Sequence, residues 1–224
     1  MHLTNRVIVI TGGSKGLGLT LALSFAKMGN KVVIASRSIN SKSKFGINIL
    51  AIKTNIVNEI EVKRLADVAI KKFGRIDIWI NNAGIWLAHC PIEKIDIKKV
   101  HELIEINLFG TIYGSKYALM QMRKQGMGII VNILSSSALD GGAGSSGYCA
   151  SKFAASGFTK CLRLEVAKDK IDVISVYTRG MKTNFFDEKK PEKYGDFMDP
   201  MHIAKRIIAN LKLKKPNQDL IIKK

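Results

Sequence analysis

The chain has 224 residues, 46% of them hydrophobic, which is enough to bury a core without disulfide bonds or bound metal. Its three cysteines form no Cys-x-x-Cys pair and no zinc-binding cluster, so we expect no bound metal. No stretch approaches the roughly 20 apolar residues of a membrane span, and none has the order of a secretory signal. We therefore expect a cytoplasmic protein without a membrane segment. The 36 Lys and Arg outnumber the 18 Asp and Glu, and the formal charge of +18 would attract anions such as nucleotides or nucleic acid.

Short β-branched segments alternate with longer amphipathic segments along the whole chain. We predict strands at residues 6–11, 31–36, 48–55, 76–81, 128–134, 171–177 and 220–222. We predict helices at residues 17–28, 59–73, 98–125, 147–168 and 200–213. This alternation predicts an α/β fold, a doubly wound, seven-stranded parallel sheet of the Rossmann-like kind with helices on both faces. No linker or repeat divides the chain, so residues 1–224 are expected to form a single domain.

Two connections differ from this simple alternation. Residues 38–46 are few for a full crossover helix, which puts the usual second helix in doubt. Residues 187–199 are polar and charged and follow an aromatic pair, Phe185-Phe186, so we expect a long surface excursion. Such a loop at the carboxyl edge of a parallel sheet often covers a ligand.

A glycine-rich turn directly follows the first strand and opens the first helix. Backbone N–H groups at the positive end of a helix dipole bind phosphate, and glycines let the backbone approach it closely. In this strand-turn-helix setting we expect the pyrophosphate of a dinucleotide, whereas glycines after a strand would otherwise mean only a tight turn. The expected contacts are Gly12, Ser14, Lys15, Gly16, Leu17 and Gly18.

The charges near this turn bear on the choice of dinucleotide. An acidic residue at the end of the second strand favours NAD, because it bonds the ribose hydroxyls and repels an extra phosphate. Here that strand ends at Ser36-Arg37, Lys15 lies in the glycine turn, and no carboxylate precedes Glu59. Either cation alone is commonly an ordinary surface residue. Together they predict NADP(H) as the cofactor.

Tyr148 and Lys152 lie four residues apart and therefore on one face of the predicted helix. A tyrosine needs a nearby cation to act as an acid/base near neutral pH, and Lys152 is placed to supply it. Such pairs also occur by chance in many helices. Ser135, at the end of the fifth strand, can point into the same cleft, and Asn107 lies in the preceding helix.

Taken in chain order, these motifs resemble those of the short-chain dehydrogenase/reductase family over essentially the whole chain. They are the glycine turn, Asn81-Asn82-Ala83-Gly84 after the fourth strand, Asn107, Ser135, and Tyr148 with Lys152. The resemblance implies that Tyr148 donates or accepts the substrate proton and that Ser135 hydrogen-bonds the substrate oxygen. It further implies that Lys152 binds the nicotinamide ribose and lowers the pKa of Tyr148, and that Asn107 holds a water molecule that relays protons to Lys152.

The resemblance also implies further cofactor contacts. Those expected on the adenosine and ribose side are Asn55, Ile56, Asn82, Ala83 and Gly84, and Thr183 is expected at the nicotinamide amide. Two departures affect this prediction: Asn55 replaces the usual Asp, and Thr178-Arg179 replaces the usual Pro-Gly pair after the sixth strand.

The sequence thus predicts an NADP(H)-dependent oxidoreductase that acts on a small-molecule carbonyl or alcohol, with both sites in one domain. A catalytically impaired NADP(H)-binding regulator or scaffold is the alternative, favoured by Thr178-Arg179. Nucleic-acid binding is disfavoured, because no basic run with interleaved aromatic residues occurs. The segment after Gly84, residues 139–147 and residues 185–199 would form a partly hydrophobic substrate pocket. A homodimer through the helices that carry Asn107 and Tyr148 is compatible with this fold.

Overall fold

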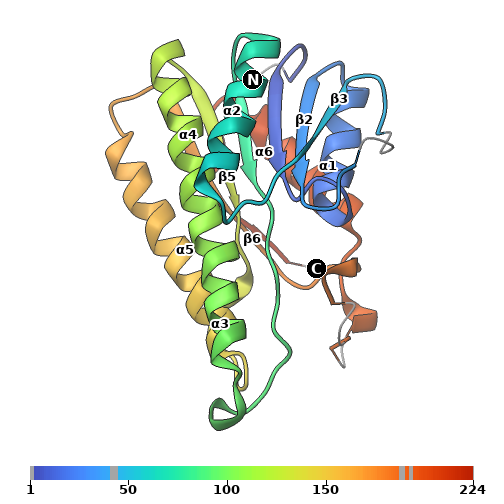
Figure 1. Ribbon diagram of the computed structural model, residues 1–224, viewed down its shortest axis with the longest axis vertical. Coiled ribbons are helices and arrows are strands. Elements are labelled where there is room, and N and C mark those ends of the chain that lie inside the picture. The colour runs from blue at the N-terminus through green and yellow to red at the C-terminus, as the bar shows by residue number, and fades with distance from the viewer. Residues whose placement is uncertain (1–2, 41–44, 187–189, 192–193, 224) are drawn as a thin grey trace.

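In the computed structural model, the strands form one parallel sheet in the order β3-β2-β1-β4-β5-β6-β7 (Figure 1). The structure describes residues 3–40, 45–186, 190–191 and 194–223. The strands are β1 (Val7–Thr11), β2 (Lys31–Ser36), β3 (Ile49–Lys53), β4 (Ile78–Asn81), β5 (Gly128–Ile133), β6 (Ile171–Thr178) and β7 (Asp219–Ile222). The predicted doubly wound sheet of seven strands is confirmed. The strand order reverses between β1 and β4, and the connections that leave these two strands in opposite directions open a crevice at the carboxyl edge.

Helices cover both faces of this sheet. They are α1 (Gly16–Lys27), α2 (Glu59–Phe73), α3 (Ile97–Ile104), α4 (Gly110–Gln125), α5 (Ser146–Glu165) and α6 (Pro200–Lys212). Helices α1 and α6 pack into one apolar core, and α2, α4 and α5 into a second core on the other face (Figure 1). Because both faces are covered, a central strand such as β1 is apolar and buried along its length.

Two predicted elements differ from the structure. The predicted helix at 98–125 is interrupted by a π-helical turn, Glu105–Phe109, which separates α3 from α4. The third strand ends at Lys53 rather than at residue 55, because the backbone N–H of Asn55 donates to the Glu61 carboxylate (2.7 Å) and not to a neighbouring strand. No helix connects β2 and β3 in residues 37–40 and 45–48, and residues 41–44 lie outside the described chain.

The predicted surface excursion at 187–199 is described only in part. Residues 187–189 and 192–193 lie outside the described chain. The described remainder contains a short 3-10 helix, Tyr194–Asp196, and a bridge between Met198 and Met181. This bridge holds the end of the excursion against the segment that follows β6.

Beneath the carboxyl edge, a buried polar network joins β4, β5, α4 and α5. The Trp79 indole N–H donates to Asn81 Oδ1 (2.7 Å), and Asn81 Nδ2 donates to Asn132 Oδ1 (2.8 Å) and Ser115 Oγ (3.0 Å). Asn132 Nδ2 in turn donates to Thr159 Oγ1 (2.9 Å). These five residues are almost completely buried, so the network fixes two helices relative to two central strands.

Gly114 on α4 leaves the space that this network needs. A Cβ at that position would lie 2.1 Å from Asn81 Oδ1 and 2.6 Å from Trp79 Nε1. We predict that Gly114→Ala lowers the free energy of unfolding by about 1–3 kcal/mol, because the buried hydrogen bonds must rearrange. Gly157→Ala on α5 is the matched control, since a Cβ there has no neighbour within 4 Å and a helical alanine adds about 0.5–1 kcal/mol. Urea unfolding measures both, and equal stabilities of the two variants would contradict the prediction.

Candidate active site

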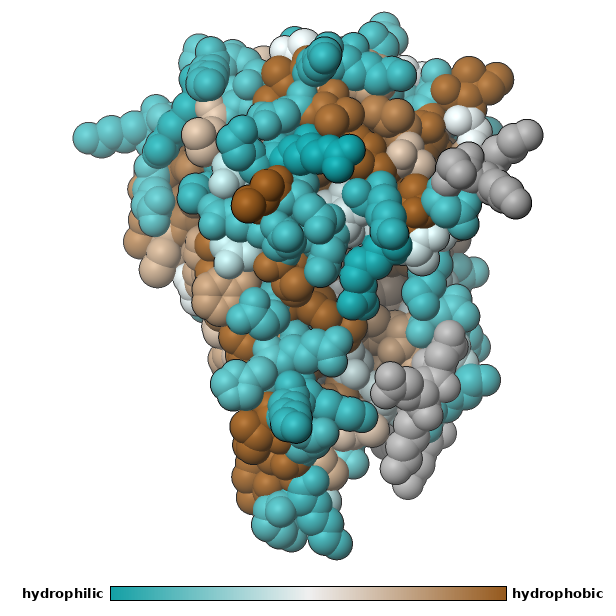
Figure 2. Space-filling model, viewed as in Figure 1, coloured by the Kyte–Doolittle hydropathy of each residue, from teal (hydrophilic) through white to brown (hydrophobic). Residues whose placement is uncertain are grey.

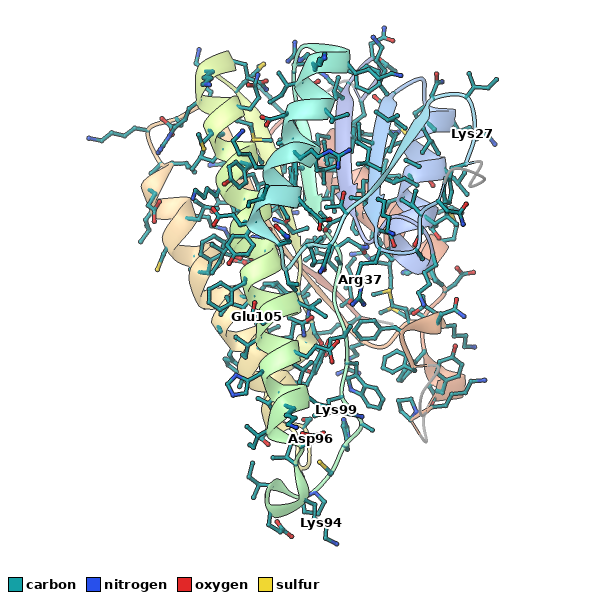
Figure 3. All side chains as sticks on the ribbon, viewed as in Figure 1. Lys27, Arg37, Lys94, Asp96, Lys99 and Glu105 are labelled. Carbon is teal, nitrogen blue, oxygen red and sulfur yellow. The ribbon has the colours of Figure 1, made fainter. Side chains whose placement is uncertain are left out.

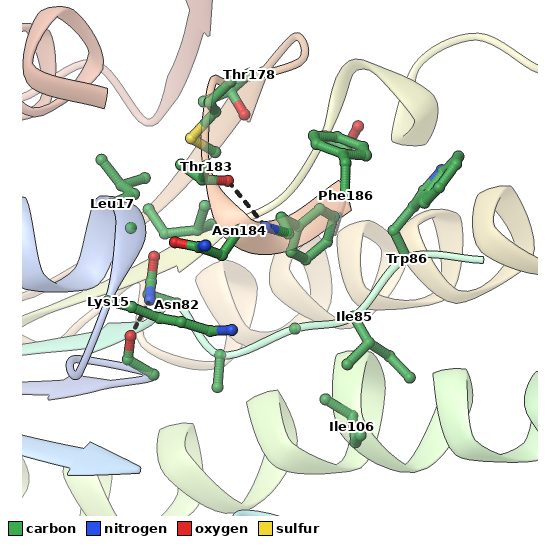
Figure 4. A pocket seen from close by; sticks show the side chains of 18 of the residues that line it. Lys15, Leu17, Asn82, Ile85, Trp86, Ile106, Thr178, Thr183, Asn184 and Phe186 are labelled. Carbon is green, nitrogen blue, oxygen red and sulfur yellow. Dashed lines mark hydrogen bonds between the residues drawn. The ribbon is translucent and has the colours of Figure 1, made fainter. Parts of the chain in front are cut away.

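A cleft of about 360 Å³ opens at the carboxyl ends of the strands. It extends from the glycine turn, with Lys15 and Leu17, to Trp86 and Phe186 at its other end (Figure 4). All of the predicted site residues line it except Gly18 and Asn107, which are buried beside it. Those that line it are Gly12, Ser14, Lys15, Gly16, Leu17, Arg37, Asn55, Ile56, Asn82, Ala83, Gly84, Ser135, Tyr148, Lys152 and Thr183.

The glycine turn brings backbone close to backbone. Gly12 has a φ of +65°, and a Cβ on it would lie 2.8 Å from the Cα of Ala83. A Cβ on Gly18 would lie 2.3 Å from the Gly12 carbonyl oxygen. Within the described chain no side chain caps α1, whose N-cap is Lys15, and its first turn has no acidic residue. The first N–H groups of this helix therefore suit an anion at the cleft.

Hydroxyl groups and cations gather where β2 ends. The hydroxyl oxygens of Ser14, Ser36 and Ser38 lie 2.9–3.1 Å from one another. Arg37 and Lys15 are exposed beside them, and Figure 3 labels Arg37. The sequence analysis did not single out Ser36 and Ser38, although their places on either side of Arg37 were a signal. A phosphate here would meet three hydroxyls and two cations.

Asn82 fastens the end of β4 to the glycine turn. Its Nδ2 donates to the carbonyls of Thr11 (2.9 Å) and Gly12 (3.2 Å), while the Thr11 hydroxyl accepts from the N–H groups of Asn82 and Ala83 (both 3.1 Å). The two sides of the cleft are thereby held together at its base. Asn82 is thus a connecting residue as well as a lining residue.

Tyr148 and Lys152 lie on the first turns of α5, and both are more than nine-tenths buried. Burial raises the pKa of Tyr148 to about 12; the hydrogen bond with Ser135 opposes this, and Cys149 adds slightly to it. Burial lowers the pKa of Lys152 to about 8. The Lys152 ammonium lies 5.9 Å from the centre of the Tyr148 ring and donates to the Ile133 carbonyl (3.4 Å).

The expected lowering of the Tyr148 pKa by Lys152 is therefore not found in this structure. The ammonium bonds to a strand carbonyl and faces the ring, so burial dominates the pKa of the phenol. Ser135 makes the only contact that lowers this pKa among the described residues. At neutral pH the phenol is protonated and the lysine is mostly charged.

Asn107 lies in the π-helical turn, and its side chain is almost fully hydrogen-bonded. Oδ1 accepts from the Ile85 N–H (2.9 Å), and Nδ2 donates to the Ile85 carbonyl (3.0 Å) and to Ser151 Oγ (3.0 Å). A Cβ on Gly84 would lie 3.0 Å from Asn107 Oδ1 and 3.7 Å from Lys152 Nζ, so these two groups flank the same point. The side chain thus positions neighbouring backbone, and the implied water relay stays a prediction.

The segment after β6 crosses the cleft. Thr183 lies against the glycine turn, with its Cγ2 3.4 Å from where a Cβ on Gly16 would be. Thr178 belongs to β6 and is buried, whereas Arg179 is exposed at the cleft. Among the described residues the Arg179 guanidinium has no hydrogen-bond or ion-pair partner. The pair that replaces Pro-Gly therefore contributes a buried hydroxyl-bearing side chain and one cation at the cleft.

A group of aromatic side chains at the cleft was not predicted as a group. Trp86, Phe185, Phe186 and Phe197 line it together. The sequence analysis placed the segment after Gly84 and the Phe185-Phe186 pair near the substrate, but no sequence pattern shows that rings so far apart meet. Within the described chain no group of side chains could hold a metal ion, and none of its helices is long and apolar enough to cross a membrane.

Comparisons with known proteins show the family of the chain. A family model for short chain dehydrogenases matches residues 6–194. The chain is 33% identical over 199 residues to (+)-borneol dehydrogenase 2 of Salvia officinalis, a match that covers 86% of this chain and 70% of that protein. The chain therefore belongs to the short-chain dehydrogenase family of oxidoreductases, as its motifs predicted.

Solved structures share the fold. A 3-ketoacyl-(acyl-carrier-protein) reductase from Brucella melitensis, complexed with NADH, has a TM-score of 0.88 at 25% identity, covering 98% of this chain and 97% of that chain. An alcohol dehydrogenase from the archaeon Thermococcus sibiricus, complexed with 5-hydroxy-NADP, has a TM-score of 0.87 at 22% identity, covering 97% and 95%. One of these neighbours holds NADH and the other an NADP derivative, so the likeness does not decide between the two cofactors.

Proposed function

We propose that the protein is an NADP(H)-dependent oxidoreductase that moves a hydride between the nicotinamide cofactor and a carbonyl or alcohol substrate, with Tyr148 as the acid/base. One observation carries the proposal: Tyr148, Ser135 and Lys152 line the same cleft as the glycine turn. A single domain, residues 1–224, carries both the cofactor and the substrate site.

The residues of the cleft fit a dinucleotide. Gly12 has the backbone conformation and Gly18 the close backbone approach that a phosphate-binding turn needs, and α1 offers its uncapped N–H groups. Arg37, Lys15 and the hydroxyls around them suit the extra phosphate of NADP. When bound, NADPH supplies the hydride that reduces the carbonyl carbon and becomes NADP⁺.

The residues at the other end of the cofactor site hold and move the proton. Tyr148 is protonated at neutral pH, so its hydroxyl can donate to the carbonyl oxygen of a substrate as that oxygen becomes an alcohol. Ser135 hydrogen-bonds Tyr148 and can bond the same substrate oxygen. Lys152, which is mostly charged at neutral pH and lies 5.9 Å from the centre of the Tyr148 ring, is placed to bind the nicotinamide ribose beside the phenol.

The alternative of a catalytically impaired binding protein is not favoured. It depended on Thr178 and Arg179: Thr178 is packed into β6, and Arg179 lines the cleft as one of its four cations. The three proposed catalytic side chains all line the cleft. NADPH oxidation with a panel of ketones and aldehydes separates the two functions, because only an active reductase consumes NADPH.

We also propose a homodimer through α4 and α5. Helix α4 directly follows the turn that carries Asn107, and α5 carries Tyr148. Exposed apolar side chains lie along these helices, among them Met120, Phe153 and Leu164. A shallow apolar depression lies between the two helices. Figure 2 shows apolar surface between hydrophilic side chains on this side of the molecule. The dimer would have twice the 24.7 kDa mass of the chain.

We predict that Tyr148→Phe lowers kcat at least about 10²-fold, because it removes the proton donor. The dissociation constant of NADPH should change little, since only a hydroxyl is lost. Tyr117→Phe is the matched control: its hydroxyl donates to Glu59 on α2 and does not line the cleft, so turnover should persist. More than about a tenth of wild-type turnover in Tyr148→Phe would rule out the assigned role.

We predict that NADPH binds on the order of 10²-fold more tightly than NADH, because two charge-assisted hydrogen bonds of about 1.5–3 kcal/mol each, reduced by solvent exposure, hold the extra phosphate. Arg37→Asp should abolish or reverse this preference. Lys27→Glu is the control, since this exposed cation lies at the end of α1, away from the cleft (Figure 3). Titrations with both cofactors at fixed ionic strength measure the effect, and an Arg37→Asp variant that still prefers NADPH would defeat the assignment.

A further inference from the structure

Four aromatic side chains, which we call the aromatic wall, close the end of the cleft opposite the glycine turn. They are Trp86, Phe185, Phe186 and Phe197. The ring of Phe186 meets Trp86 at 5.1 Å and 67°, Phe185 at 5.2 Å and 82°, and Phe197 at 5.1 Å and 59°. Figure 4 shows Trp86 and Phe186 at this end and Lys15 and Leu17 at the other.

The aromatic wall is held in place from behind. Phe186 is only 8% exposed, and Tyr194 packs behind it against Phe197 (5.4 Å). The Phe197 ring lies on the backbone of Gly180, where a Cβ would come within 2.5 Å of ring atoms. These contacts bury Phe186 at the centre of the aromatic wall and leave Trp86 and Phe185, which line the cleft, partly exposed.

Trp86 is also tied to the proposed catalytic helix. Its neighbour Ile85 exchanges two hydrogen bonds with Asn107, whose Nδ2 also donates to Ser151. Ser151 donates to the carbonyl of Tyr148 (2.7 Å). The backbone next to Trp86 is therefore linked to the backbone of Tyr148 by a short chain of hydrogen bonds.

The charges of the cleft narrow the class of ligand. Among the described residues no Asp or Glu lines it, whereas Lys15, Arg37, Lys152 and Arg179 do. A substrate with a positive charge would find no counter-ion and would be repelled. A neutral or anionic substrate meets no such penalty.

We propose that the aromatic wall is a substrate subsite for a planar ring, and that the substrates are neutral or anionic ketones and alcohols carrying an aryl or comparable ring. The inference rests on the proposed function, since the carbonyl must reach Tyr148 while the ring contacts Trp86 and Phe185. Offset and edge-to-face ring contacts add to simple apolar burial. A puckered aliphatic ring gains the burial alone.

Paired ketones of equal connectivity test this directly. We expect kcat/KM for 4-phenyl-2-butanone to exceed that for 4-cyclohexyl-2-butanone about 2- to 10-fold, although the cyclohexyl ring buries at least as much apolar surface. Trp86→Leu should remove the preference, and Trp86→Phe should retain part of it. Phe73→Leu, which changes a ring on α2 outside the cleft, should leave it unchanged. Equal kcat/KM values in the wild-type protein would overturn the proposal.

A binding measurement separates this proposal from the proposed function. The chain has two tryptophans, and Trp79 is fully buried, so a ligand-dependent change in tryptophan emission reports Trp86. Titration with 4-phenyl-2-butanol, without cofactor, should give a saturable change that Trp86→Phe abolishes, and 4-cyclohexyl-2-butanol should bind more weakly. Saturable binding without any NADPH oxidation would support the subsite and refute the reductase. NADPH oxidation with no emission change for either alcohol would refute the subsite alone.

Discussion

The side chain of Asn107 connects the segments that form the catalytic end of the cleft. Through three hydrogen bonds it holds the backbone of Ile85 and reaches Ser151 on α5. The π-helical turn gives Asn107 this position, because an added residue in the turn shifts its side chain out of the regular helical register. These contacts hold the segment that carries Trp86 against the first turns of α5, which carry Tyr148. The proposed substrate and proton-transfer sites therefore depend on them.

The charge of the protein is organised around the cleft as well as spread over the surface. The cleft carries four cations and, within the described chain, no carboxylate. Two of them, Lys15 and Arg37, gather with three hydroxyls where the phosphate of NADP is proposed to bind. Lys152 instead is buried, which lowers its pKa and makes its charge responsive to pH near 8. The same sign of charge is thus proposed to serve phosphate recognition at one end of the cleft and proton transfer at the other.

The sequence predicted the sheet, the glycine turn and the convergence of Tyr148 with Lys152, because period, glycine position and helical spacing are local signals. It did not predict the π-helical turn at Asn107, since the apolar period continues through α3 and α4. Nor could it show that Trp86 meets Phe186, because that contact depends on tertiary packing. The Tyr148 pKa also differs from expectation, because burial of the phenol raises it and the Lys152 ammonium bonds the Ile133 carbonyl.

The central claim is that a protonated Tyr148, supported by a charged Lys152, donates a proton to the substrate. The pH dependence of kcat/KM for ketone reduction with NADPH tests it most directly. Tyr148, with a pKa of about 12, stays protonated throughout, so the profile should be flat from about pH 6 to 7.5 and fall above about pH 8 as Lys152 loses its charge. A rate that rises through pH 8, or no NADPH oxidation at any pH, would contradict the account.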